Sequence, residues 1–228
     1  MIPVGAETMP QTPIWAFQKC AVIVGYPGDE AIWAAGTILM HPESQWTVIT
    51  LRHKSEQEFV HRFFEAVAAL GAAGAIANLD DKPDLSKPIN IEIQRAIMEV
   101  LPYDRYDLVI THGPWGEQKA RPRQEETSKA VFALLENEVL FTGRTWRFAY
   151  EAAAGTLVPR FVRDADTIIR LTDSIWQKKY DIVTKIYGCA PNSFEAKAAG
   201  RVEAFWNFAK HKHPEKPAPQ PSDAAKRP

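Results

Sequence analysis

Hydrophobic residues follow two alternating patterns along most of the chain. Short runs that are apolar at nearly every position predict buried strands at residues 21–24, 46–51, 75–79, 107–112, 146–150 and 167–171. Apolar residues three or four positions apart predict helices at residues 31–40, 55–70, 89–100, 124–135 and 172–186. Continuous apolar strands that alternate with amphipathic helices indicate an α/β fold, Rossmann-like, with a mostly parallel sheet and helices on both faces.

Polar residues at the helix starts fit this assignment. Ser55 is a candidate N-cap, with Glu58 completing a capping box, and Thr172 is a candidate cap for the last predicted helix. The pattern begins after residue 18 and fades after residue 210. We therefore predict an N-terminal extension at 1–18, one domain at 19–210 and a disordered proline-rich tail at 211–228.

Composition excludes several classes of protein. The 228 residues are 46% hydrophobic and 24% charged, with a net charge of −1, so no overall basic charge indicates nucleic-acid binding. No apolar run approaches the ~20 residues of a membrane span, and the first residues lack a signal-peptide pattern. Cys20 and Cys189 could pair, but reduced thiols are the better expectation for such a chain. We expect a cytoplasmic protein that binds neither nucleic acid nor membrane.

The most informative segment is the turn after the first strand, Gly-Tyr-Pro-Gly-Asp-Glu at residues 25–30. In open α/β sheets, ligands bind at the carboxyl ends of the strands. The turn resembles the His-Pro-Asp-Asp-Glu signature of the PIG-L/LmbE-like N-acetylglucosaminyl deacetylases, which are zinc enzymes. Further segments resemble the same family, at residues 110–117, 148–151, 187–188 and 193–200. The resemblance covers roughly residues 19–208 and implies the family's fold.

The resemblance also shows which family residues this chain has lost. Tyr26 replaces a zinc-ligand histidine, Gly28 replaces the general-base aspartate, and Gln124 replaces the last metal-binding histidine, while Arg121 replaces the first histidine of that pair. Asp29 is the one matched ligand that remains. A phenol with a pKa of about 10 and a neutral amide are poor zinc ligands, and glycine offers no base. We therefore expect no catalytic residue, no metal site and no cofactor.

Two acids and a histidine near this turn have more than one interpretation. Asp29 is either a relic metal ligand or the N-cap of the first helix, and Glu30 is expected to support the turn. His112, at the end of the fourth strand, either lines a pocket or makes a structural hydrogen bond. A rebuilt metal site from Asp29, His53 and His112 is awkward, because the second and fourth strands should flank the first on opposite sides. His41 and His61 are expected to be solvated.

The remaining candidate ligand-binding residues are Trp115, Glu117, Arg121 and Arg123, together with His112. The two arginines could pair with Asp29 or Glu117, or they could join Lys119, and Arg52 or Lys54, in an anion-binding rim. Trp115 is placed at a pocket mouth, where its ring could stack on a sugar.

These observations predict a catalytically inactive homologue of zinc-dependent N-acetyl-sugar deacetylases. Such a pseudoenzyme would be retained to bind a small sugar-like or anionic ligand, or as a scaffold for protein partners that the sequence does not identify. The alternative is an active zinc-dependent deacetylase with a rearranged metal site that uses Asp29 and His112.

Overall fold

The computed structural model describes residues 17–79, 89–117, 122–151, 153, 156 and 158–208. Most of the predicted N-terminal extension, the proline-rich tail, Lys119 and Arg121 lie outside these residues. Within the described part of the chain, no helix is both long and apolar enough to cross a bilayer.

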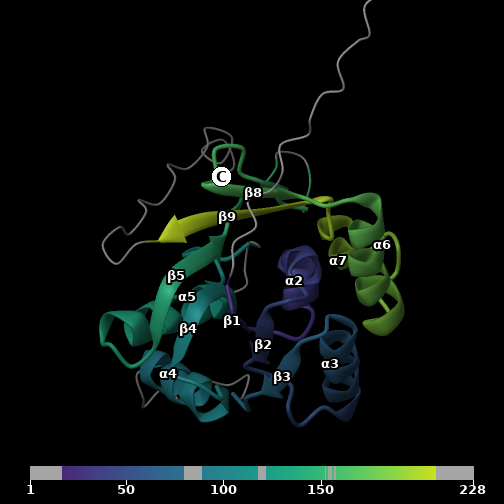
Figure 1. Cartoon of the computed structure of the whole chain (residues 1–228). Coiled ribbons are helices and arrows are strands. Elements are labelled where there is room, and N and C mark those ends of the chain that lie inside the picture. The colour runs from purple at the N-terminus through teal and green to yellow at the C-terminus, as the bar shows by residue number, and fades with distance from the viewer. Residues whose placement is uncertain are drawn as a thin grey trace, which may run out of the picture.

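A seven-stranded sheet forms the centre of the molecule, in the order β3-β2-β1-β4-β5-β9-β8 (Figure 1). The first five strands of that order are parallel, and β9 is antiparallel to both of its neighbours. Its strands are β1 (Lys19–Val24), β2 (Gln45–Thr50), β3 (Ala73–Ile76), β4 (Arg105–Thr111), β5 (Phe141–Phe148), β8 (Thr167–Arg170) and β9 (Val202–Phe208). A separate two-stranded sheet pairs β6 (Tyr150–Glu151) with β7 (Arg160–Phe161). The predicted mostly parallel α/β sheet is confirmed.

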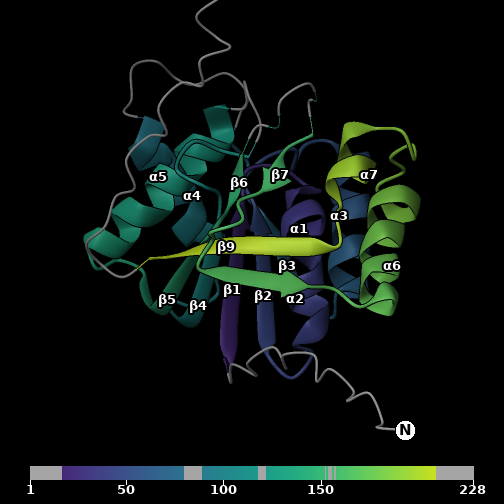
Figure 2. The same cartoon turned by 90° about the horizontal axis from the view of Figure 1, so that it is seen from above.

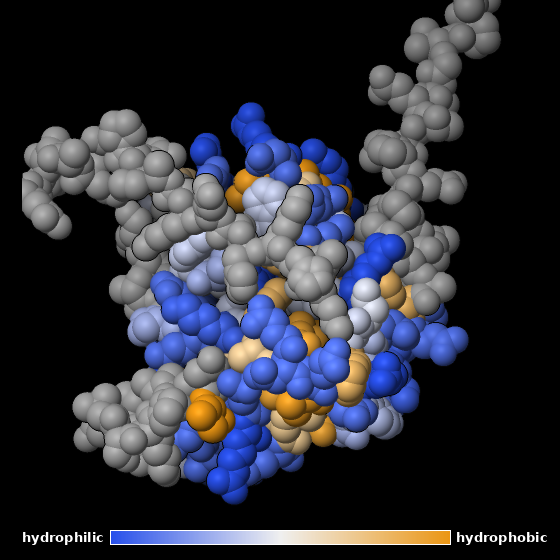
Figure 3. All heavy atoms as spheres, turned by 90° about the vertical axis from the view of Figure 1, so that its left-hand side faces the viewer, coloured by the Kyte–Doolittle hydropathy of each residue, from blue (hydrophilic) through white to orange (hydrophobic). Residues whose placement is uncertain are grey.

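Helices cover both faces of the sheet, as the view from above shows (Figure 2). One face carries α4 (Ile89–Val100) and α5 (Pro122–Glu136), and the surface on that side of the molecule is mostly hydrophilic with smaller apolar areas (Figure 3). The other face carries α1 (Asp29–Trp33), α2 (Ala35–Met40), α3 (Gln57–Ala69), α6 (Asp173–Asp181), the π-helix η1 (Ile182–Ile186) and α7 (Phe194–Ala198).

Alternate residues of β1 serve the two sides of the sheet. Cys20, Val22 and Val24 belong to the core under α1–α3, whereas Ala21 and Ile23 belong to the core under α4 and α5. All five are fully buried, which explains why the strand is apolar at each of these positions.

Several local predictions need correction. The predicted helix at 31–40 is two short helices that meet at Ala34. Helix α3 begins after Glu56, which makes no side-chain cap, so the proposed Ser55 cap is wrong, whereas Thr172 does cap α6 through a bond from the Ile175 N–H. His41 is buried rather than solvated, while His61 is exposed as expected.

The sequence pattern did not predict β9, which carries a buried acid. Glu203 accepts hydrogen bonds from the backbone N–H groups of Gly36 and Thr37 at 2.8 and 2.7 Å. It also pairs with the buried Lys179 at 2.7 Å. Glu203 therefore ties α2 and α6 to β9, the strand next to the edge strand β8. Glu203 and Asn207 interrupt the apolar run and hide the strand from a hydropathy pattern.

Candidate functional site

The predicted site lies where β1 and β4 end side by side. Their register pairs Ile23 with Thr111, so the turn after β1 lies next to His112. Gly28 caps α1 with φ +99°, a left-handed conformation that residues with side chains rarely adopt. The N-cap is thus Gly28 rather than Asp29, which is the first residue of the helix.

His112 is held on both ring nitrogens. Its Nδ1 lies 2.5 Å from Glu117 Oε2, and the Gly25 N–H donates to its Nε2 at 3.0 Å. The ring is completely buried. Of the two interpretations open from the sequence, the structural hydrogen bond is the one found, and His112 does not line the adjoining cavity.

Two carboxylates set the charge of His112. Burial alone would lower the pKa of the imidazole, but Glu117 and Asp29 outweigh burial and raise the pKa to about 10. The bond from Gly25 requires a lone pair on Nε2, so it belongs to the ring protonated at Nδ1 alone. Protonation of Nε2 would exchange that bond for one to Asp29 Oδ2, 3.4 Å away.

Gln124 links the two acids of this network. Its Nε2 donates to Asp29 Oδ1 at 3.3 Å, and its Oε1 accepts from the Glu117 N–H at 3.1 Å. The other Asp29 oxygen, Oδ2, accepts from the Tyr26 N–H at 3.3 Å. We call Asp29, His112, Glu117 and Gln124 the closed network, because all four are buried and bonded to one another or to backbone groups.

The closed network does not fit a zinc ion. Zinc needs several lone pairs that converge on one point from histidine, cysteine or carboxylate ligands. Here the Gly25 N–H occupies the Nε2 lone pair of the neutral His112 ring, the cationic ring has no free lone pair, and both Asp29 oxygens already accept hydrogen bonds. No group of three or more histidine, cysteine, aspartate or glutamate residues among the described residues could hold a metal ion.

Glu30 supports the turn, as expected. It accepts the Gly28 N–H at 2.9 Å and the Tyr187 hydroxyl at 2.5 Å. Burial raises the pKa of Glu30 to about 7, although the bonds from Tyr187 and Gly28 partly oppose the rise. The Glu30 carboxyl group thus joins the start of α1 to Tyr187, and neither of its two partners is a cation.

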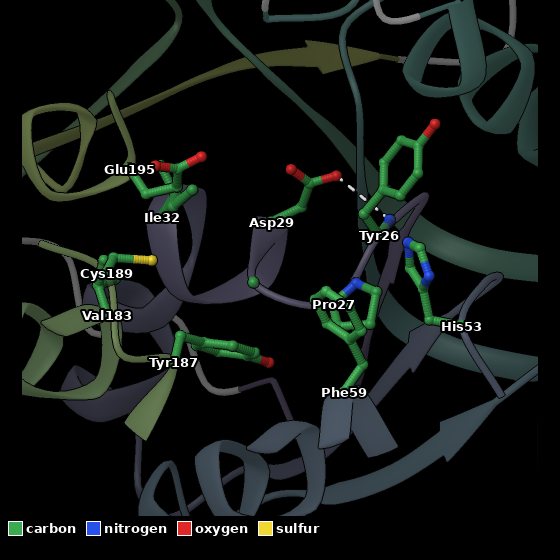
Figure 4. Close-up of a pocket in the computed structure, with 11 residues that line it drawn as sticks. Tyr26, Pro27, Asp29, Ile32, His53, Phe59, Val183, Tyr187, Cys189 and Glu195 are labelled. Carbon is green, nitrogen blue, oxygen red and sulfur yellow. Dashed lines mark hydrogen bonds between the residues drawn. The ribbon is translucent and has the colours of Figure 1, made fainter. Parts of the chain in front are cut away.

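A cavity of ≈ 470 Å³ opens on the other side of Asp29 (Figure 4). One wall comes from the turn and from α1, and the opposite walls come from the segment after β2, from α3 and from the region of η1 and α7. Its lining residues are Tyr26, Pro27, Gly28, Asp29 and Ile32, with His53, Phe59, Val183, Tyr187, Cys189 and Glu195 facing them. We call this space the Tyr187 cavity.

The remaining predicted residues are not gathered there. Trp115 is half-buried and does not line the Tyr187 cavity, and Glu117 lies inside the closed network. Arg123 pairs with Glu126 at 2.6 Å, a partner other than the two acids considered from the sequence. His53 lines the cavity, and its strand β2 lies on the far side of β1 from β4, as expected.

Several cavity residues were not predicted from the sequence. Tyr187 and Glu195 lie in two of the segments that resemble the deacetylase family, so the resemblance was the available signal. Tyr187 directly follows η1. A π-helix is rare in proteins, and where one occurs it often lies at a functional site. Its extra residue per turn alters which side chains face the cavity, and an apolar repeat does not reveal it.

Comparison with solved structures identifies the fold. An N,N'-diacetylchitobiose deacetylase from Pyrococcus horikoshii has a TM-score of 0.64 at 15% identity, over 90% of this chain and 88% of that one. Teicoplanin deacetylase Orf2, in its zinc-inhibited form, has a TM-score of 0.54 at 13% identity, over 83% and 97% of the two chains. The chain has the fold of the PIG-L/LmbE-like deacetylases. The resemblance seen in the sequence is therefore confirmed at the level of fold.

The same fold also carries other chemistry. The 4-carboxy-2-hydroxymuconate hydratase GalB from Pseudomonas putida has a TM-score of 0.57 at 15% identity, over 88% of this chain and all of that one. No protein-family model and no curated protein matches the sequence. Because one fold hosts a deacetylase and a hydratase, function must be argued from the site residues.

Proposed function

We propose that this chain is a catalytically inactive homologue of zinc-dependent N-acetyl-sugar deacetylases, retained as a protein that binds a small ligand. The observation that carries the proposal is the closed network. Gln124, at the position of a metal-binding histidine in the resemblance, bonds to Asp29 and Glu117 instead. Each possible metal ligand of the closed network is already a partner in a hydrogen bond.

The adjacent residues support the loss of the reaction as well. Gly28, at the position of the general base, has no side chain and a φ of +99°. An aspartate in this conformation would cost roughly 1–3 kcal/mol. The turn has therefore adopted a backbone that suits glycine rather than a catalytic carboxylate.

The ligand-binding part of the proposal rests on the Tyr187 cavity. Its volume of ≈ 470 Å³ lies within the range of about 300–1,000 Å³ that is typical of small-molecule sites. Aromatic rings and two carboxylates line it, as expected for a sugar-like ligand. It opens at the carboxyl end of β1, where open α/β sheets bind ligands.

One observation favours the alternative of an active deacetylase with a rearranged metal site. Asp29 Oδ2 and His112 Nε2 lie 3.4 Å apart, so a rearrangement that freed both from their present partners could present two ligands to one ion. The two proposals differ in whether the purified protein binds zinc and releases acetate.

Zinc titration of the full chain tests the proposal directly. A variant with His211→Ala and His213→Ala removes the tail histidines, which could bind zinc unspecifically. We expect neither stoichiometric zinc nor acetate release from N,N'-diacetylchitobiose or N-acetylglucosamine. Submicromolar zinc binding that Asp29→Asn abolishes, together with zinc-dependent acetate release, would establish the active alternative.

A further inference from the structure

We propose that the Tyr187 cavity binds its ligand through a protonated primary amine carried on a body of amino-sugar size. This inference rests on the proposed function, since it names the chemical class of the ligand. Four aromatic or imidazole rings and two carboxylates face the same space: Tyr26, His53, Phe59, Tyr187, Asp29 and Glu195.

The charge of the lining favours a cation. Two of the described residues that line the cavity are acids, and no described lysine or arginine lines it. The nearby Arg62 is engaged elsewhere, because it donates to the Tyr187 carbonyl at 2.7 Å and pairs with Glu58. Arg52 is buried, 5.8 Å from the centre of the Tyr26 ring. Among the described residues, an anion in the cavity would therefore meet the carboxylates of Asp29 and Glu195 rather than a lysine or arginine.

Glu195 is the acid best placed to meet an ammonium group. It lies in the first turn of α7, is half-buried and faces the cavity (Figure 4). No described side chain makes a hydrogen bond or ion pair with its carboxylate. A ligand that displaces water from this carboxylate must supply a donor or a positive charge, because an unpaired buried charge is costly.

The other ionisable groups of the lining leave the Glu195 carboxylate as its strongest negative charge. Burial, and then the charge of Glu195, raise the pKa of the Cys189 thiol, so this lining residue stays neutral at pH 7. Asp29 contributes only part of its negative charge, since its oxygens accept hydrogen bonds from Gln124 and from the Tyr26 N–H. The Glu195 end of the cavity is thus the more negative end.

Aromatic rings complete the site. His53 stacks on Phe59 with ring centres 4.6 Å apart, and the Tyr26 ring lies 5.8 Å from His53. Tyr187 is fixed on the other wall by its bond to Glu30. Ring faces attract ammonium groups and also stack on the apolar faces of sugars, so both parts of an amino sugar find a partner.

Three probes of equal ring size test the inference by calorimetric titration at pH 6.5 and low ionic strength. These are glucosamine, N-acetylglucosamine and glucose 6-phosphate, which differ in charge. We expect glucosamine to bind at least about tenfold more tightly than N-acetylglucosamine, because acetylation removes the charge. Glucose 6-phosphate should not bind.

Two variants assign the effect to Glu195. Glu195→Gln should weaken glucosamine binding about tenfold and leave the affinity for N-acetylglucosamine unchanged. Glu99→Gln, on the exposed face of α4, removes one carboxylate without touching the cavity and should leave both affinities unchanged.

Each other outcome overturns the inference. These outcomes are equal or tighter binding of N-acetylglucosamine, binding of glucose 6-phosphate, an unchanged glucosamine affinity in Glu195→Gln, and no glucosamine binding at 10 mM. The first two leave a ligand-binding protein of another specificity. Zinc-dependent acetate release would instead overturn the proposed loss of catalysis, and that result is independent of the order of these affinities.

Discussion

The two sides of Asp29 differ in how their polar groups are used. On the β4 side, the closed network buries an imidazole, two carboxylates and an amide in mutual hydrogen bonds. On the η1 side, the Tyr187 cavity keeps an open volume and a carboxylate without a described side-chain partner. The closed network is therefore part of the structural core, whereas the Tyr187 cavity remains open.

The largest effect should come from breaking the closed network at Glu117. Glu117→Ala removes the acceptor of His112 Nδ1 and of the Gly113 N–H, which donates at 2.7 Å. Because a buried histidine and a backbone donor lose their partner, we expect unfolding to become easier by about 3–5 kcal/mol. Urea denaturation measures the change. A loss below 1 kcal/mol would show that the network does not stabilise the fold.

A pH-dependent effect of similar size should come from Glu30, beside the cavity. Its pKa is raised from 4.5 to about 7, so between these values the folded state retains a proton that the unfolded state loses. Stability should therefore fall as pH rises from 4.5 to 7, by about 3 kcal/mol in total, and then level off.

Glu30→Gln tests this because an amide imitates the protonated acid toward Tyr187 and Gly28. As pH rises from 4.5 to 7, wild type should lose stability relative to the variant, so that any advantage of wild type in unfolding free energy shrinks or reverses. A difference that stays constant from pH 4.5 to 7 would contradict the raised pKa.

Introducing the metal ligands of the deacetylase signature should convert the closed network toward a zinc site. Tyr26→His with Gln124→His completes the ligand set with Asp29, and we expect zinc binding to return. Adding Gly28→Asp should cost roughly 1–3 kcal/mol of stability, because the φ of +99° disfavours any side chain. Calorimetric zinc titration and thermal unfolding of the double and triple variants measure both effects. A folded double variant with no zinc affinity would show that the position assigned to Gln124 in the resemblance is wrong.

Arg123 should show the smallest effect. Its pair with Glu126 lies near the surface on one helix, so Arg123→Ala should change stability by about 1 kcal/mol or less. We expect sulfate and sugar phosphates to leave the melting temperature of both proteins unchanged. Stabilisation of wild type by these anions, lost in Arg123→Ala and reduced by added salt, would restore the anion-binding rim as an interpretation.

The sequence by itself determined the architecture and a candidate place for the site. Apolar runs such as residues 21–24 must be buried on both faces, which requires helices on both sides of a parallel sheet. The residues at 25–30 and 110–117 identified the two strand ends that meet. Tyr26, Gly28 and Gln124 also led to the expectation that no metal site is present, which stays a prediction.

Only the tertiary structure decided what these residues do now. Gln124 is separated from Asp29 by 95 positions along the chain, and the bond between them depends on how α5 packs against β1 and β4. Tyr187 and Glu195 reach the cavity through a π-helix and a short helix that periodicity does not reveal. A hydropathy pattern predicts whether a side chain is buried. Its hydrogen-bond partner depends on which distant segments lie next to it, and only the folded chain fixes that.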